Sequence, residues 1–160
     1  MSEAERALSL DPTMALAYLQ MGVASIALGR FEEALEFFDK AIRLSPHDPS
    51  LNDMYMGKAW AYNESGHYDQ AIEWGRRAIA SNPSSNGYEM LGRAYLSKGE
   101  FEKALEFYDK AILLGPNDPD MHYYCAGKMR ALFGLNRYDE GLEDCPAKGK
   151  SGSTATRAQP

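Results

Sequence analysis

The sequence contains few of the residues on which disulfide-rich and metal-binding proteins depend. Its 160 residues include only two cysteines and three histidines. Cys125 and Cys145 are too few for a disulfide framework and do not have the spacing of metal ligands. His47, His67 and His122 have no partner three or four positions away that could share a metal ion. We therefore expect buried, inert thiols, a reducing cytoplasmic location, and no metal or other cofactor.

Long apolar runs and an excess of basic residues are also missing. No apolar run approaches the roughly 20 residues of a membrane-spanning helix, and the N-terminus lacks the features of a signal peptide. The formal net charge is −6, and residues 146–160 carry three basic residues and no acid, which leaves −9 on residues 1–145. An acidic body is a poor partner for nucleic acid phosphates. We expect neither a nucleic acid nor a membrane as a partner.

No constellation of catalytic residues emerges from the sequence. Gly57-Lys58 and Gly127-Lys128 resemble part of a phosphate-binding loop, but that motif needs a glycine five positions earlier and Ser or Thr after the lysine. Residues 52 and 122 are Asn and His, and residues 59 and 129 are Ala and Met. We expect the two lysines to extend over apolar surface and to pair with acidic neighbours. The sequence predicts a protein that is not an enzyme.

The most informative feature is an internal repeat. Residues 31–49 (FEEALEFFDKAIRLSPHDP) recur as residues 101–119 (FEKALEFYDKAILLGPNDP), and 14 of the 19 aligned positions are identical. Self-similarity at a fixed period is typical of repeat architectures, in which each unit buries its apolar face against the next. The repeat therefore determines the expected architecture.

Each unit has the same plan of two helices joined by a tight corner. A first helix is expected at about 15–28, 52–65, 85–98 and 122–135. One residue that tolerates a left-handed backbone follows each of them, namely Gly29, Gly66, Gly99 and Asn136. The second helix then begins with an aromatic residue, which is Phe31, Tyr68, Phe101 or Tyr138. Small residues follow at helical spacing, at Ala34, Ala71, Ala104 and Gly141, and again at Ala41, Ala78 and Ala111.

Paired helices about 34 residues apart, with small residues where they touch, resemble the tetratricopeptide repeat. The resemblance implies an all-α, right-handed superhelical solenoid of antiparallel helix pairs. More loosely, the alternation of long and short units resembles repeat regions attached to bacterial signalling and regulatory proteins. We divide the chain into a partial repeat with only a second helix (1–14), repeats at 15–48, 49–84 and 85–118, a truncated repeat (119–145) and a disordered tail (146–160).

The units differ in length. The interval from Pro46 to Pro83 is longer than the intervals from Pro12 to Pro46 and from Pro83 to Pro116. Asp48-Pro49 and Asp118-Pro119 open the longer units, and aspartate suits a helix N-cap while proline suits the first helical position. We therefore expect almost one extra turn on the first helix of these units.

The resemblance also implies a concave groove lined by the first helix of each unit. Transferred position by position, it predicts a partner-binding groove formed by Leu19, Val23, Met56, Trp60, Asn63, Met90, Arg93, Tyr123 and Arg130. Trp, Tyr and Arg often carry binding energy at interfaces, and Met adapts to varied partners. The family's clamp for chaperone tails needs Lys and Asn at positions that here hold Leu19 and Val23. The sequence therefore does not favour chaperone binding.

Together these features predict a non-catalytic scaffold or adaptor that binds a protein or peptide in the groove. The alternative is a module for homo-oligomerisation, because terminal repeats without polar caps would expose apolar surface to another copy.

Overall fold

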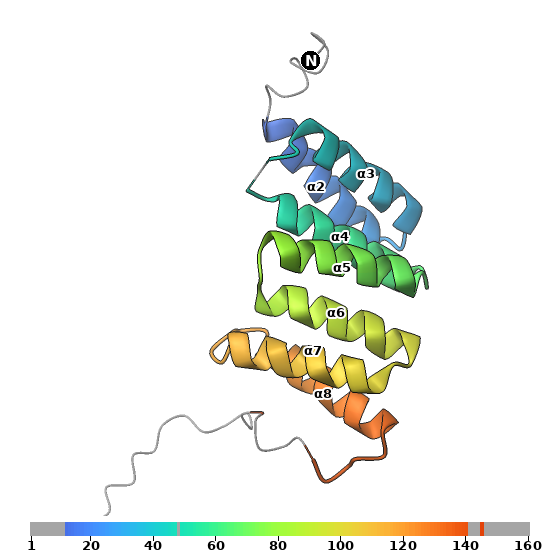
Figure 1. Cartoon of the computed structure of the whole chain (residues 1–160). Helices are drawn as coiled ribbons and strands as arrows, with labels where there is room; N and C mark the ends of the chain where they lie inside the picture. Colours follow the sequence, from blue (N-terminus) through green and yellow to red (C-terminus); the bar gives the residue numbers. More distant parts are fainter. Residues whose placement is uncertain (1–11, 48, 141–144, 146–160) are drawn as a thin grey trace, which may run out of the picture.

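The computed structural model describes residues 12–47, 49–140 and 145, and every regular element in these residues is an α-helix. Figure 1 shows the helices stacked one after another along the molecule. This arrangement confirms the prediction of an all-α solenoid. The helices are α2 (Pro12–Ala27), α3 (Phe31–Leu44), α4 (Leu51–Glu64), α5 (Tyr68–Ser81), α6 (Ser85–Lys98), α7 (Phe101–Leu114) and α8 (Met121–Gly134).

A left-handed residue follows each first helix. Gly29, Gly66 and Gly99 have φ angles of 71°, 81° and 83°, and Asn136 has a φ of 57°. The residue after each of them donates its backbone N–H to a carbonyl near the end of the helix, as His67 does to Tyr62 at 2.8 Å. This hydrogen bond satisfies a carbonyl that the helix end leaves without a partner, and it reverses the chain direction. A single residue in the left-handed conformation at each corner therefore reverses the chain direction.

Two expected helix boundaries were wrong. Helix α2 begins at Pro12 rather than near residue 15, because proline suits the first turn of a helix. The longer units have no extra helical turn, since α4, α6 and α8 each contain 14 residues. The additional residues lie in the preceding connections, where Pro49 and Pro119 occupy turns and the N-caps are Ser50 and Asp120. Aspartate followed by proline suits a turn as well as a helix start, and here it forms the turn.

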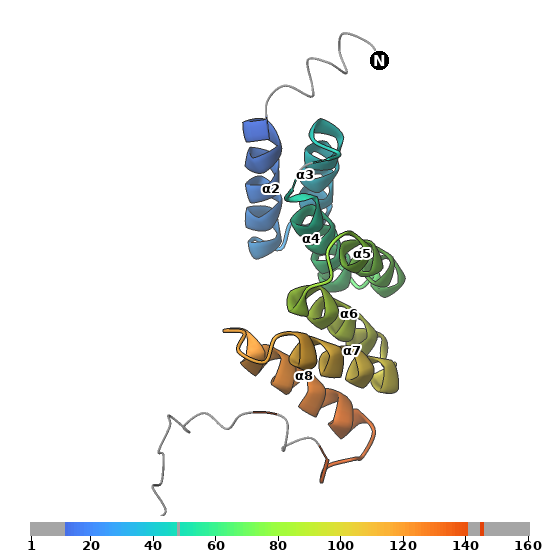
Figure 2. The same cartoon turned by 60° about the vertical axis from the view of Figure 1, so that its left-hand side comes forward.

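Small residues allow the second helices to approach their neighbours closely. Ala34, Ala71, Ala104 and the corresponding Ala41, Ala78 and Ala111 are all buried, with exposed fractions of at most 1%. The first helices pack on the second helices that precede and follow them in the chain. In Figure 2 the helix pairs succeed one another down the molecule, from α2 and α3 to α8. The core therefore runs as a continuous layer between helices rather than as one central cluster.

The lysines of the two Gly-Lys pairs, Lys58 and Lys128, form ion pairs between helices. Lys58 is buried and its Nζ lies 2.6 Å from the Asp39 carboxylate and 3.8 Å from the centroid of the Trp74 ring. Lys128, at the equivalent position of the fourth unit, is also buried and pairs with Asp109 at 2.9 Å. Each pair joins a second helix to the first helix of the next unit. The lysines therefore pair with acidic neighbours, as predicted.

The fourth unit departs from the predicted plan. Tyr138 and Asp139 lie in a turn and Glu140 in a bend, so the expected second helix does not begin at Tyr138.

The expectation of free thiols was also wrong, because Cys125 and Cys145 form a disulfide with a Cα–Cα separation of 5.7 Å. This bond connects α8 to the segment that follows it, and it removes the basis for predicting a reducing compartment. The spacing of the two cysteines in the sequence gave no signal that the fold would bring them together.

Several expectations lie outside the described residues. These are the partial repeat expected before Pro12, the second helix expected in the fourth unit from Gly141 onward, and the disordered tail expected at 146–160. Among the helices that the structure describes, none combines the length and apolar character needed to cross a membrane.

Candidate groove for a protein partner

The first helices of successive units lie next to one another and form one side of the molecule. Helix α2 contacts α4, α4 contacts α6, and α6 contacts α8. A cavity of about 510 Å³ opens on this side, which we call the groove cavity. Its walls come from α2, α4, α6 and α8 and from the residue immediately before α8. The lining residues are Val23, Asp53, Met56, Gly57, Trp60, Asn86, Glu89, Met90, Arg93, Asp120, Tyr123 and Tyr124.

Most of the predicted groove residues line this cavity. They are Val23, Met56, Trp60, Met90, Arg93 and Tyr123. The structure therefore brings together side chains from all four first helices, although these helices are well separated in sequence. Trp60, Met56 and Met90 are half-buried, so their apolar surface stays partly accessible.

Three predicted groove residues lie elsewhere. Leu19 is 6% exposed and belongs to the core cluster around Phe38, because its position borders the core and its apolar side chain packs inward. Asn63 lies almost one helical turn beyond Trp60 and is also buried, at 7% exposure. Arg130 is exposed but does not line the cavity, which is bounded on α8 only by residues near its beginning.

The same transfer of inward positions also reaches Asp53, Gly57, Asn86 and Glu89, which line the cavity as well. Two lining residues, Asp120 and Tyr124, lie outside that transfer. Asp120 precedes α8, so a transfer of positions within the first helices could not include it. Tyr124 is 1% exposed, and its hydroxyl donates a hydrogen bond to the side-chain oxygen of Asn86 on α6. The available signal was the pair Tyr123 and Tyr124 near the start of α8. Neighbouring residues on a helix point in different directions, so one of the two tyrosines can face the groove while the other packs toward the core.

Ionic contacts hold the cationic side chain of the groove cavity in place. The Arg93 guanidinium lies 2.7 Å from the Glu64 carboxylate on α4 and 3.9 Å from the Glu89 carboxylate on its own helix. Arg93 therefore joins α4 to α6 while its alkyl chain forms part of the wall. Its charge is balanced by carboxylates that already contact it.

Glu89 is the most perturbed acid of the cavity. Its side chain is 14% exposed. Burial raises the pKa of Glu89 to about 7, with a further upward contribution from the Asp120 carboxylate, while Arg93 acts in the opposite direction. Close to neutral pH, this carboxyl group is therefore about half ionised. No group of three or more His, Cys, Asp or Glu side chains in the described part of the chain is arranged to hold a metal ion.

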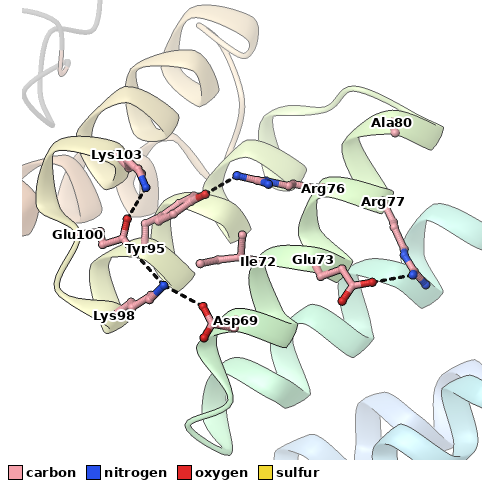
Figure 3. A pocket seen from close by; sticks show the side chains of 10 residues that line it. All are labelled: Asp69, Ile72, Glu73, Arg76, Arg77, Ala80, Tyr95, Lys98, Glu100 and Lys103. Atoms are coloured by element: carbon pink, nitrogen blue, oxygen red, sulfur yellow. Dashed lines mark hydrogen bonds and ion pairs between the residues drawn. The ribbon is translucent and has the colours of Figure 1, made fainter.

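A second cavity of about 610 Å³ lies between α5, α6 and α7 (Figure 3). Its charged side chains are largely paired with one another: Lys98 lies 2.8 Å from Asp69 and 2.9 Å from Glu100, and Lys103 lies 2.5 Å from Glu100. Hydrogen bonds from Lys103 and Lys98 lower the pKa of Glu100 to about 2. This cavity is larger, but its ionic network offers few free groups and little aromatic surface. The groove cavity is therefore the better candidate for a partner site.

Comparison with known proteins places this architecture in a family. One tetratricopeptide repeat model matches residues 13–84, and a model described as anaphase-promoting complex, cyclosome, subunit 3 matches residues 64–143, half of the chain. The chain belongs to the tetratricopeptide repeat family. The two matched ranges overlap, and together they reach every described helix.

Individual tetratricopeptide proteins resemble the chain over different lengths. Small glutamine-rich tetratricopeptide repeat-containing protein 2 of Mycosarcoma maydis is 31% identical over 86 residues, which are 53% of this chain and 24% of that protein. Anaphase-promoting complex subunit 3 of Schizosaccharomyces pombe is 31% identical over 138 residues, which are 86% of this chain and 20% of that protein. The chain thus spans about a fifth to a quarter of these relatives.

A solved tetratricopeptide domain shows the same fold. The first such domain of Spaghetti (RPAP3), bound to the HSP90 peptide SRMEEVD, has a TM-score of 0.68 and 21% identity, and the match covers 80% of this chain and 98% of that domain. The tetratricopeptide fold is generally a non-catalytic interaction module.

Proposed function

We propose that this tetratricopeptide chain is a non-catalytic scaffold that binds a segment of a partner protein in the groove cavity. The observation that carries the proposal is the convergence of Trp60, Met56, Met90, Arg93 and Tyr123 from three helices on one open cavity. Large aromatic side chains and arginine dominate the binding energy of protein interfaces. A cavity of this volume also has the size of typical ligand sites.

The family supports the proposal. A solved domain of the same fold is bound to an HSP90 peptide, which supports peptide binding by a solenoid of this kind. The residues that line the groove cavity include no nucleophile with an adjacent base, so they support binding rather than catalysis.

Replacing Trp60 and Tyr123 together by alanine should weaken partner binding by at least about thirtyfold, because two aromatic rings that line the groove cavity are lost together. Peptides that bind the unmodified chain would first be selected from a random library. Their dissociation constants would then be measured by fluorescence anisotropy with both proteins. Leu113→Ala is the control, since Leu113 is 83% exposed and lies outside the groove cavity. Unchanged affinity in the double variant, at unchanged helical content, would contradict docking in the groove cavity.

Self-assembly is the second candidate function. It is supported by apolar side chains on α8, where Met129 and Phe133 are 50% and 69% exposed. Light scattering over a concentration series separates the two candidates, because a monomer at every concentration would rule out self-assembly and leave the scaffold hypothesis intact.

A further inference from the structure

We propose that the groove cavity selects a positively charged partner segment, in which a lysine or arginine is flanked by apolar side chains. This inference rests on the proposed function and adds the chemistry of the partner. It follows from the acidic side chains that line the cavity, from the ion pairs that Arg93 already makes, and from the apolar and aromatic side chains of the walls.

The charged side chains that line the groove cavity are mostly acidic. Asp53 on α4, Glu89 on α6 and Asp120 at the start of α8 all line it, and Arg93 is the only basic residue among the lining residues. Two of the three carboxylates come from successive first helices, and the third comes from the residue immediately before α8. A segment that enters the cavity therefore meets an excess of negative charge, which favours a cation by charge complementarity.

The positive charge of Arg93 does not attract an acidic ligand to the groove cavity, because carboxylates of the chain already pair with it. Its guanidinium contacts the Glu64 carboxylate at 2.7 Å and the Glu89 carboxylate at 3.9 Å. An acidic ligand could reach Arg93 only by replacing these contacts while also approaching Asp53 and Asp120. A cationic ligand can leave the Arg93–Glu64 contact in place.

The walls suit the flanks and the stem of a long basic side chain. Met56, Met90 and Val23 provide apolar surface, and Trp60 and Tyr123 provide aromatic rings at which a cation is attracted by the π-system. The chain already uses this interaction outside the groove cavity, where the Lys58 ammonium lies 3.8 Å from the Trp74 ring centroid. The whole molecule is acidic as well, which increases the rate at which a basic segment arrives.

This preference is opposite to that of a domain that binds an acidic tail. The peptide on the Spaghetti (RPAP3) domain, SRMEEVD, carries its acidic residues at the C-terminal end. In this chain the positions that the family resemblance assigns to the Lys and Asn of a carboxylate clamp hold Leu19, which lies in the core, and Val23, which lines the groove cavity. The fold is therefore shared, while the preference that we propose for the groove cavity is for the opposite charge.

The most direct experiment compares three peptides that differ only in charge. Each is a fluorescein-labelled nonapeptide with blocked ends and the same leucine and serine positions, and the three remaining positions are all lysine, all glutamine or all glutamate. We expect the lysine peptide to bind on the order of tenfold more tightly than the glutamine peptide, and the glutamate peptide to bind most weakly. Added salt should reduce the affinity for the lysine peptide only.

Matched variants assign the effect to the groove cavity. Asp53→Asn with Asp120→Asn should remove most of the preference for the lysine peptide. Glu32→Gln with Glu36→Gln changes the net charge of the chain equally on the exposed side of α3, and it should leave the preference intact. Circular dichroism would show that both double variants keep their helices. Equal effects of the two pairs would overturn the assignment to the groove cavity.

Glu89 supplies a second test, through pH. The groups that face it are Arg93 on its own helix, Asp53 on α4, Tyr108 on α7, and Asp120 and Tyr124 at α8. Because the pKa of Glu89 is about 7, this carboxyl group is mostly neutral at pH 6 and mostly ionised at pH 8. Affinity for the lysine peptide should therefore rise severalfold from pH 6 to pH 8, and Glu89→Gln should abolish this rise. The series is run in a His122→Gln background, since the His122 ring packs on Tyr123 with centroids 4.0 Å apart.

The outcomes distinguish this inference from the proposed function. If the glutamine or glutamate peptide binds as tightly as the lysine peptide, the charge preference is wrong and docking in the groove cavity stands. If none of the three peptides binds and library peptides are also insensitive to Trp60→Ala, docking in the groove cavity itself is wrong. A lysine preference that persists after Asp53→Asn with Asp120→Asn and after Glu89→Gln would overturn the inference.

Discussion

Phe38→Ala should lower the free energy of unfolding by about 3–5 kcal/mol, as expected for the loss of a fully buried aromatic side chain. The Phe38 side chain is fully buried, with 0% exposure, within the cluster formed by α2, α3 and α4. Removing the ring loses its transfer free energy and leaves a cavity that close-packed neighbours cannot fill.

The neighbours of Phe38 explain why this cavity would stay open. The ring lies between Gly22 on α2 and Gly57 on α4, and a Cβ atom added to either glycine would come within 2.6 Å of it. Two glycines opposite each other on successive first helices form a slot for this one ring. Glycines have no side chain that could move into the space, so the helices themselves would have to shift.

Phe37→Ala is the matched control, because it removes the same side chain from the adjacent position of the same helix. Phe37 is half-buried, stacks on Tyr18 with ring centroids 6.1 Å apart and lies under the Lys40 ammonium. Its loss should cost about 1–2 kcal/mol. Urea unfolding followed by circular dichroism measures both variants, and equal losses would show that the slot around Phe38 adds nothing.

The fold could be predicted from sequence because its decisive features are local. A residue that accepts a positive φ, followed two positions later by an aromatic helix start, specifies the corners at Gly29, Gly66 and Gly99. At the fourth corner Asn136 has the positive φ, but Tyr138 lies in a turn. The fold therefore follows largely from short patterns that recur along the chain. The exception is the Asp-Pro pair before α4 and α8, where one dipeptide suits either a helix start or a turn. Only the packing of the following helix decides between them.

The groove could be predicted only in part, because it depends on helix rotation. Leu19 and Met56 occupy the same position in successive units, yet Leu19 is in the core and Met56 lines the groove cavity. A position at the border between two faces can turn either way, and its neighbours determine the outcome. Asp120 shows the same limit, since a connection between units contributes a wall of the cavity. The disulfide between Cys125 and Cys145 depends on how the chain returns to α8, which no local pattern specifies.

Gly127→Val should lower the free energy of unfolding by about 3 kcal/mol or more, through a clash rather than a cavity. In the second copy of the repeat, the Tyr108 ring takes the place of Phe38 and occupies the equivalent slot between Gly92 on α6 and Gly127 on α8. A Cβ atom at Gly127 would overlap the Tyr108 ring, and valine adds two methyl groups in the same direction. Tyr108 is 1% exposed and has no free space to enter, so α8 would have to move away from α7.

Ala126→Val is the control that separates the clash from the lower intrinsic helix propensity of valine. Residue 126 is adjacent on α8 and exposed, so valine there should cost only about 0.6 kcal/mol of helix propensity. At Gly127 the propensity change is slightly favourable, so any loss there comes from packing. Thermal and urea unfolding would compare the two variants. In the Gly127→Val background, Tyr108→Leu should recover part of the loss because it shortens the side chain that clashes. If Gly127→Val lowered the free energy of unfolding as little as Ala126→Val, α7 and α8 would not approach each other closely at Tyr108. The packing of an aromatic ring between two glycines would then not hold successive units together.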